Sequence, residues 1–590
     1  MKSQLIAVVF IQALLLVGCS NSGENNQQGD GGTEITEPGG VLPGYGDDEI
    51  GFRNQGANNG NGSADDGNGA PAGGSESADE DSGSDMDGDS DSDMDVDTDM
   101  DTDTDTDTEV APDAGIDDGG PPESDVTENP FYTASEMPTN TFSIDVDTGS
   151  YTLVRQHLDN GQLPEAKSVR LEEMINYFKY NYEIPTGDNP FTIYTEMAEC
   201  PWNKQRKLVM LGMRGQQVEM DDQPAANLVY LLDVSGSMAQ ELWLIKPAFR
   251  MLTKQLRPQD TLSIVTYAGN DSVVIDGGTG SDKESILAAL DNLQSGGSTN
   301  GAGGIQKAYE LAEKHFKPGG NNRVVLATDG DFNVGISSEE GLVDLIETKA
   351  DSGVFLTVYG FSTWGAGNYQ DSKMEQLANH GNGTYFFIDG EAEARRAFTH
   401  SLSGTLLTIA KDVKLQVQFN PDMVKGYRLI GYDNRTMSND DFNNDSVDAG
   451  ELGNAEDMTA FYEVILASSD ESVPPTDVTN DDNLGSETEY EPLEAEQFMA
   501  VRMRYKMPDS DTSELLTHPI STFHNVNKPS SKFVFASTIA QLGLVLRESA
   551  YIENTSISSL RGNILDAFHD SSVAAVAELI SLIDKADELL

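Results

Sequence analysis

The stretch from Asn227 to Met238, NLVYLLDVSGSM, constrains the fold more than any other part of the chain. Its first half, Leu228 to Leu232, is a short apolar run with polar residues on either side. Such a run predicts a strand buried on both faces, as in a parallel sheet. Its second half places a carboxylate and two hydroxyls at alternate positions, Asp233, Ser235 and Ser237. A loop that curls away from the strand end turns these oxygens toward one point.

Three oxygens do not fill the coordination shell of a hard divalent cation such as Mg²⁺, which prefers near-octahedral oxygen ligands and keeps some water. The segment Gly296–Asn300, GGSTN, precedes a predicted helix, and Arg323–Gly330, RVVLATDG, predicts a second buried strand ending in a carboxylate. In an open α/β sheet, ligands bind at the carboxyl ends of the strands. We therefore expect one metal site formed by five residues: Asp233, Ser235, Ser237, Thr299 and Asp329. The alternative is that the serines cap the next helix and Asp329 only ends a strand.

In this order, DxSxS, the GGST threonine and the TDG aspartate resemble the von Willebrand factor A (VWA) domain with its metal-ion-dependent adhesion site (MIDAS). The resemblance implies that Mg²⁺ or Mn²⁺ is bound there and that a partner's Asp or Glu carboxylate completes the coordination. Strand and helix patterns alternate throughout residues 226–409, which predicts a doubly wound, mostly parallel α/β domain.

Other chemistry finds no support in this domain. No Gly-rich phosphate loop with a following Lys is present, so we expect no nucleotide. Ser235 lies in a VSGS context and not in a GxSxG nucleophile elbow, and no His pairs with it in the sequence, so we expect no enzyme activity.

The segments on either side, residues 129–225 and 410–590, contain runs in which apolar and polar residues alternate. They predict half-exposed antiparallel strands, at 191–198, 207–213, 413–419, 427–432, 458–466 and 498–505. Our fold prediction is one β-sandwich built from both flanks, with the α/β domain inserted between them. A helix capped by Ser150 and a second helix at 169–177 are expected early. Three helices are expected at the end, at 533–547, 557–568 and 572–588.

The first flank, residues 129–225, contains sequence motifs that are specific to one family. FSIDVDTGSY, GQLPEAKSVRLEEMINYF and CPWN are similar to the YfbK-like bacterial lipoproteins, and the resemblance runs from about Asn129 to the C-terminus. Asp145 and Asp147 in this flank form either a second metal site or a strand-to-helix turn, and the turn is favoured. The loop Asn439–Glu456 has enough oxygens for Ca²⁺ but lacks EF-hand spacing, so a plain hairpin loop is favoured.

The N-terminal segment has the layout of an export signal. Residues 1–18 contain Lys2 and a short apolar run, which is typical of a lipoprotein signal peptide that leaves Cys19 as the lipidated first residue. Ser20 after that Cys favours the outer membrane. Residues 19–128 are rich in Asp, Gly and Ser, which predicts a disordered, solvated tether. The only other cysteine is Cys200, so no disulfide framework is expected.

The chain is strongly acidic, with 36 basic and 100 acidic residues and a formal net charge of −64. This charge disfavours nucleic acid as a partner. The predicted function is a membrane-anchored extracytoplasmic binding, adhesion or scaffold protein in a bacterial cell envelope. It would engage a partner carboxylate through the metal ion. The alternative is an assembly factor for an envelope complex linked to a MoxR-type ATPase.

Overall fold

The computed structural model describes the chain from residue 127 onward, except for residues 188, 269–270, 298–300, 331–338, 364–368, 404–406, 476–491, 509, 511, 524–527, 553–554 and 569–572. The predicted signal peptide, Cys19 and nearly all of the predicted tether therefore lie outside the described residues. In the part that is described, no helix has both the length and the apolar character that a membrane span requires.

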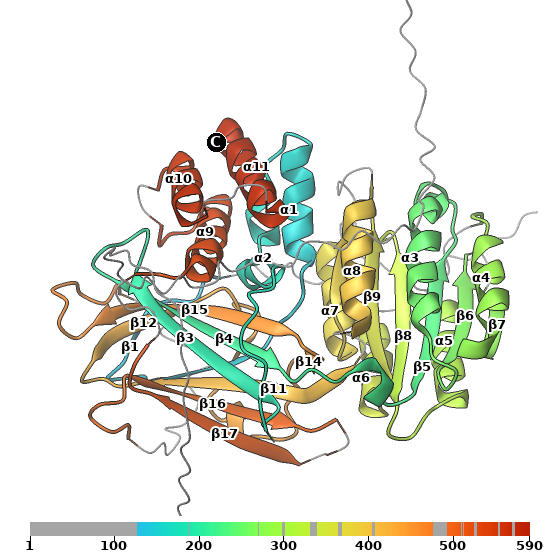
Figure 1. Ribbon diagram of the computed structural model, residues 1–590, viewed down its shortest axis with the longest axis horizontal. Helices are drawn as coiled ribbons and strands as arrows, with labels where there is room; N and C mark the ends of the chain where they lie inside the picture. The colour runs from blue at the N-terminus through green and yellow to red at the C-terminus, as the bar shows by residue number, and fades with distance from the viewer. Residues whose placement is uncertain are drawn as a thin grey trace, which may run out of the picture.

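The α/β domain predicted at residues 226–409 is called the A domain below. A six-stranded sheet forms its centre, in the order β10-β9-β8-β5-β6-β7 (Figure 1). Neighbouring strands are parallel except for the pair β6 and β7. The strands are β5 (Ala226–Asp233), β6 (Thr261–Tyr267), β7 (Asp271–Thr279), β8 (Asn321–Thr328), β9 (Phe355–Phe361) and β10 (Tyr385–Ile388). The doubly wound fold predicted from the sequence is confirmed, with β7 as an antiparallel edge strand.

Helices cover both faces of this sheet. One core contains residues of α3 (Leu242–Gln255), α4 (Lys283–Asp291) and α8 (Glu391–Ser403). The other contains residues of α5 (Gly301–Lys314), α6 (Glu339–Asp351) and α7 (Asp371–His380). Strand β5 contributes Leu228, Tyr230 and Leu232 to the first core and Val229 and Leu231 to the second. This alternation is why its sequence is apolar at every position from Leu228 to Leu232 and not only at every second one.

A β-sandwich built from both flanks stands beside the A domain (Figure 1). Its sheets have the orders β1-β12-β15-β4-β3 and β13-β2-β11-β16-β17, and β14 pairs with β11. Strands from the first flank pair with strands from the second, for example Leu211 with Ala460 and Thr141 with Gln416. The predicted sandwich with an inserted domain is confirmed. Its strands are β1 (Tyr132–Thr133), β2 (Thr139–Ser143), β3 (Phe191–Glu199), β4 (Lys207–Gly215), β11 (Thr408–Phe419), β12 (Val424–Ile430), β13 (Thr436–Met437), β14 (Leu452–Gly453), β15 (Asp457–Leu466), β16 (Met499–Lys506) and β17 (Ser513–Ile520).

The prediction that these strands are half-exposed is wrong for the central ones. Every residue of β15 except the last is buried, and β12 is buried at all but one position. A layer of helices covers the outer face of this sheet (Figure 1), so its polar residues are buried as well. The covering helices are α1 (Gly149–Asp159), α2 (Leu171–Asn176), α9 (Ser531–Leu546), α10 (Ile557–Ala567) and α11 (Ala574–Leu589).

Local details of the first flank also differ from expectation. Helix α1 begins at Gly149, and Ser150 lies inside its first turn instead of capping it. The Ser150 hydroxyl donates to the carbonyl oxygen of Ser168 at 2.7 Å and accepts from the backbone N–H of Arg170 at 2.9 Å. Ser150 therefore joins α1 to the start of α2. Strand β17, an edge strand with mostly exposed residues, was not expected from the sequence.

Candidate functional site

The central strand β5 and its neighbour β8 end side by side. Leu232 pairs with Ala327 in parallel register, so Asp233 and Asp329 follow at the same edge of the sheet. From β5 the chain moves outward to β6, and it later returns to the other side of β5 as β8. The two carboxylates thus flank the point at which the strand order reverses, where open α/β sheets bind their ligands.

The loop after β5, residues 233–238, is here called the metal loop. Asp233 is fully buried, and its Oδ1 accepts a 2.8 Å hydrogen bond from the backbone N–H of Ser235. Its Oδ2 is also buried and has no hydrogen-bond partner among the described residues. The hydroxyl oxygens of Ser235 and Ser237 lie 2.9 Å apart, and Ser237 is exposed. The loop thus brings together one carboxylate and two hydroxyls, as the motif predicts.

The helix-capping alternative for the two serines is wrong. Ser237 is the first residue of a short 3-10 helix, Ser237–Gln240, whose N-cap residue is Gly236. Helix α3 follows with Glu241 at its N-cap, and neither helix start has a side-chain capping hydrogen bond. The serine hydroxyls are therefore not committed to a helix end.

The loop that carries Thr299 is held against the metal loop by backbone hydrogen bonds. The N–H of Gly296 donates to Val234 at 2.8 Å, and the N–H of Gly236 donates to Gly297 at 3.2 Å. Gly297 has a φ of 96°, a conformation that favours glycine. Thr299 itself lies two residues further on, outside the described residues.

The electrostatics of the site follow from burial of like charges. Burial raises the pKa of Asp233 to about 6, against the lowering effect of its hydrogen bonds from Ser235, and the negative charge of Asp329 adds to the rise. Asp329 is half-buried and precedes Gly330, whose φ of 86° forms the turn after the strand. A carboxylate such as Asp233, whose ionisation is disfavoured by burial and by a nearby negative charge, is stabilised by a cation beside it.

Glu241 is a further acidic residue at this edge that the motif search missed. It is buried, and its Oε1 accepts from the backbone N–H of Thr363 at 3.1 Å and from the Thr363 hydroxyl at 2.9 Å. Burial raises its pKa, and the charge of Asp329 contributes. Glu241 thereby fixes the loop after β9 to the start of α3. A lone Glu at a helix start gives no sequence signal for this role.

Asp145 and Asp147 form a strand-to-helix turn between β2 and α1, as favoured from the sequence. Oδ1 of Asp145 accepts from the backbone N–H of Asp147 at 2.8 Å, and Oδ1 of Asp147 accepts from that of Tyr385 at 2.8 Å. Oxygens of both residues lie near those of Glu173. Arg435 pairs with Asp145 at 3.0 Å and Arg170 pairs with Glu173, so guanidinium groups partly offset these charges, although burial still raises the pKa of Asp147 and of Glu173.

The donors of the metal loop fit a hard divalent cation. Carboxylate and hydroxyl oxygens are the ligands that Mg²⁺ and Mn²⁺ take, and no His or Cys ligand accompanies them in the metal loop. The buried Oδ2 of Asp233 without a hydrogen-bond partner is the strongest local indication, because an unpaired buried carboxylate oxygen costs free energy unless a cation offsets it.

Comparisons with protein families match nearly all of the described chain. The model described as von Willebrand factor type A domain matches residues 227–400, the one described as Uncharacterized protein YfbK, C-terminal, matches 404–589, and one described as von Willebrand factor matches 123–210. The Uncharacterized protein YfbK of Escherichia coli (strain K12) is 37% identical over 469 residues, which cover 78% of this chain and 80% of that protein.

Solved structures that are similar to this chain share little sequence identity with it. A von Willebrand factor type A protein from Catenulispora acidiphila is 14% identical and covers 68% of this chain and 91% of its own, with a TM-score of 0.39. The ArnB paralog VWA2 from Sulfolobus acidocaldarius is 13% identical and covers 68% and 98%, with a TM-score of 0.34.

Proposed function

This chain belongs to the YfbK family and contains a von Willebrand factor type A domain, and from that premise we propose that it is an envelope protein that binds a partner carboxylate through a divalent cation. VWA domains are typically binding or adhesion modules and commonly use a divalent metal. The finer proposal concerns which residues hold the metal here and what they bind.

Asp233, Ser235, Ser237 and Asp329 are the described residues that would hold Mg²⁺ or Mn²⁺, and Thr299 is the proposed fifth. A bound cation would supply positive charge beside the carboxylates of Asp233 and Asp329. The observation that carries the proposal is the buried Oδ2 of Asp233, which has no hydrogen-bond partner among the described residues and belongs to the same loop as the two neighbouring serine hydroxyls. Glu241 acts as a positioning residue, because it holds the loop that contains Thr363.

A bound cation also explains how an acidic protein could bind an acidic partner. Two carboxylate-bearing surfaces repel one another, and a shared divalent ion turns that repulsion into attraction at one point. The exposed Ser237 places the loop at the surface, where a partner's Asp or Glu can approach. Lipid anchoring through Cys19 would hold this surface at the membrane, on the bacterial envelope side.

The first test measures metal binding by the purified chain. The unfolding temperature is recorded at increasing concentrations of MgCl₂ or MnCl₂. Ligand that binds only the folded state raises the unfolding temperature by mass action. We expect this rise in the wild type and its loss in Asp233→Ala. The matched control is Asp422→Asn, a charge removal at an exposed turn of the sandwich. If neither metal changes the unfolding temperature of the wild type, the proposal that this chain binds a divalent cation is wrong.

The second test concerns the partner. Membrane fractions are incubated with the immobilised chain in Mg²⁺ or in EDTA, and bound proteins are identified by mass spectrometry. A specific partner is retained by the wild type in Mg²⁺ and released by EDTA, and Asp233→Ala does not retain it. A partner captured equally under all three conditions would contradict a carboxylate–metal contact.

A further inference from the structure

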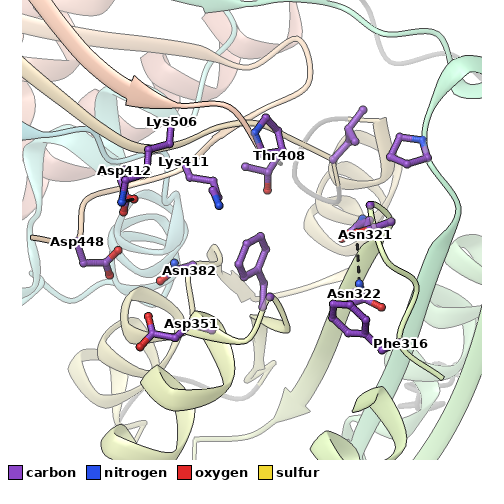
Figure 2. A pocket seen from close by; sticks show the side chains of 18 of the residues that line it. Phe316, Asn321, Asn322, Asp351, Asn382, Thr408, Lys411, Asp412, Asp448 and Lys506 are labelled. Atoms are coloured by element: carbon purple, nitrogen blue, oxygen red, sulfur yellow. Dashed lines mark hydrogen bonds and ion pairs between the residues drawn. The ribbon is translucent and has the colours of Figure 1, made fainter. Parts of the chain in front are cut away.

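A second set of oxygen donors lies at the seam between the A domain and the sandwich. Two cavities open along this seam, of about 540 Å³ and about 310 Å³, and Asp448 lines both. The larger lies at the starts of β8 and β9 and is therefore at the opposite edge of the parallel sheet from the metal loop. Figure 2 shows Asp351 and Asn382 of the A domain across this cavity from Asp412 and Asp448.

Three carboxylates converge where the two cavities meet. Asp412 belongs to β11, and Asp448 and Glu451 belong to the loop that precedes β14. Each offers an oxygen atom that lies within 4.8 Å of the others. We call these three residues the seam cluster. Asp412 is distant in sequence from the other two, and the register shift in β11 between Lys411 and Lys414 lies at its position.

The Glu451 carboxylate gives a second, independent indication that this cluster binds a cation. Although part of the Glu451 residue reaches the surface, its Oε1 is fully shielded from solvent and no hydrogen-bond donor among the described residues reaches it. A buried carboxylate oxygen without a donor is energetically unfavourable. This oxygen therefore calls for a cation or a proton.

Positive side chains of the seam only partly offset this charge. Nζ of Lys506 lies 2.6 Å from Oδ2 of Asp412. The charge of Arg323 also acts on Glu451, but its guanidinium donates to the hydroxyls of Thr357 at 2.7 Å and Thr408 at 3.4 Å. Nζ of Lys414 donates to two backbone carbonyls of the same loop, at 3.2 Å and 2.6 Å.

The protonation preferences of the cluster agree with a shortage of positive charge. Burial raises the pKa of Asp448 to about 7, and the neighbouring carboxylate of Asp412 adds to the rise. Burial also raises the pKa of Glu451 well above its ordinary value, with the charges of Asp448 and Asp412 contributing. Carboxylates in this situation take up a proton or bind a cation, and a bound cation reverses the shift.

We propose that Asp412, Asp448 and Glu451 bind one Ca²⁺ ion, and that this ion fastens the A domain to the sandwich. All three ligands are oxygens, and two come from an irregular loop, which suits the flexible coordination of Ca²⁺ better than the strict octahedron of Mg²⁺. Ca²⁺ takes six to eight oxygen ligands. The adjoining cavity has room for water, and it places Asp351 and Asn382 of the A domain within the same space. The ion thereby links ligands of the sandwich to groups of the A domain.

The test separates this site from the metal loop by working in an Asp233→Ala background. Thermal unfolding of the full chain is followed with CaCl₂ from micromolar to millimolar concentrations, after dialysis against EDTA. We expect Ca²⁺ to raise the unfolding temperature by several degrees, with a midpoint of roughly 10⁻⁴ to 10⁻³ M as in extracellular Ca²⁺ modules. Adding Glu451→Gln or Asp448→Asn abolishes the rise, whereas Asp422→Asn leaves it intact.

A reversal of stability order gives a second readout. In EDTA, Glu451→Gln removes like-charge repulsion and is expected to be at least as stable as its parent. In millimolar Ca²⁺ it is expected to be the less stable of the two. The Asp448 residue is exposed overall, although its carboxyl group is desolvated by its neighbours, so Asp448→Asn is expected to fold even if the Glu451 variant does not. A rise that persists in both cluster variants, or no rise in the Asp233→Ala parent, would overturn the proposal and leave the metal loop untouched.

Discussion

The guanidinium of Arg155 in α1 grips Asp389, the residue after β10, with two hydrogen bonds: Nη2 to Oδ1 at 2.8 Å and Nε to Oδ2 at 3.0 Å. The same guanidinium reaches Glu393 of α8 at 3.0 Å and Glu578 of α11 at 3.0 Å. One side chain of the first flank therefore contacts the A domain and the last helix of the chain. Arg155 thus connects the first flank, the A domain and the C-terminal helix α11.

Arg155→Met is expected to destabilise the whole chain, because it leaves Asp389 without its cation and leaves Glu393 with Arg396 alone. Only 12% of the Arg155 side chain and 1% of the Glu393 side chain are exposed. Breaking a buried pair by removing one partner costs on the order of 3–5 kcal/mol. Urea unfolding monitored by tryptophan fluorescence measures this loss. Arg250→Met is the control, since its ion pair with Asp291 is largely exposed and is worth about 1 kcal/mol or less. If both variants lost the same free energy of unfolding, Arg155 would not have the connecting role described above.

Glu172 gives the fold a pH dependence. Burial raises its pKa to about 7, with Asp433 and Asp145 contributing, against the hydrogen bond that it accepts from the backbone N–H of Tyr432. Because the raised pKa favours the protonated form in the folded state, stability falls as pH rises from about 4.5 to about 7. The full penalty, on the order of 3 kcal/mol, is present above that window.

Glu172→Gln removes this penalty, so the variant is expected to be more stable than the wild type at pH 8 and similar at pH 4.5. Urea midpoints at the two pH values measure the difference. Glu165→Gln serves as the control because 75% of the Glu165 side chain is exposed, and it is expected to follow the wild type at both. A Glu172→Gln variant that is less stable than the wild type at pH 8 would show that hydrogen bonding outweighs ionisation there.

Glu463 anchors two arginines beneath the helical layer. Its Oε1 accepts from Arg206 at 2.8 Å and its Oε2 accepts from Arg428 at 3.0 Å. Glu463 and Arg428 are essentially unexposed. Glu463→Gln should therefore cost on the order of 3–5 kcal/mol in chemical denaturation. Glu514→Gln, an exposed residue of the edge strand β17, is expected to cost less than about 1 kcal/mol.

Local sequence patterns predicted parts of the fold, whereas the buried ion pairs could not be predicted from them. The metal loop follows an apolar run with a motif, so Asp233, Ser235 and Ser237 were predictable together from local spacing. The alternating strands of the sandwich were predictable as strands, but their burial was not. Glu463 and Arg428 have the polarity of an exposed face, and only the position of the distant helices α9 to α11 makes that face a buried one.

The rest of the site depends on contacts that leave no local pattern. Glu241 faces Thr363, which is 122 residues away, and the seam cluster joins β11 to a later loop. The loop at 439–456 contained enough oxygens to suggest Ca²⁺, yet its ligand spacing fits no known motif. The proposed Ca²⁺ site could not be predicted from the loop alone, because Asp412 comes from a strand outside that loop.

Gly304 of α5 supports the metal loop from below by close packing. A Cβ atom at this position would lie 2.8 Å from Cβ of Tyr267, a rigid part of the neighbouring strand β6. Tyr267 pairs with Asp233 in the sheet, and α5 begins directly after the loop that contains Thr299. Gly304→Ala must therefore push α5 away from β6, which costs roughly 1–3 kcal/mol. The displaced helix also moves the Thr299 loop away from the metal loop.

Two measurements follow for Gly304→Ala: a lower urea midpoint, and a weaker rise of the unfolding temperature in MgCl₂ than the wild type shows. Gly562→Ala is the matched control, since Gly562 lies in α10 and an added Cβ there meets nothing within 4 Å. The control is expected to gain about 0.5–1 kcal/mol from the higher helix propensity of Ala. If Gly304→Ala were as stable as that control, close packing of α5 on β6 would have no part in holding the site. If it lost stability but kept the full response to MgCl₂, the helix would be coupled to the fold and not to the metal loop.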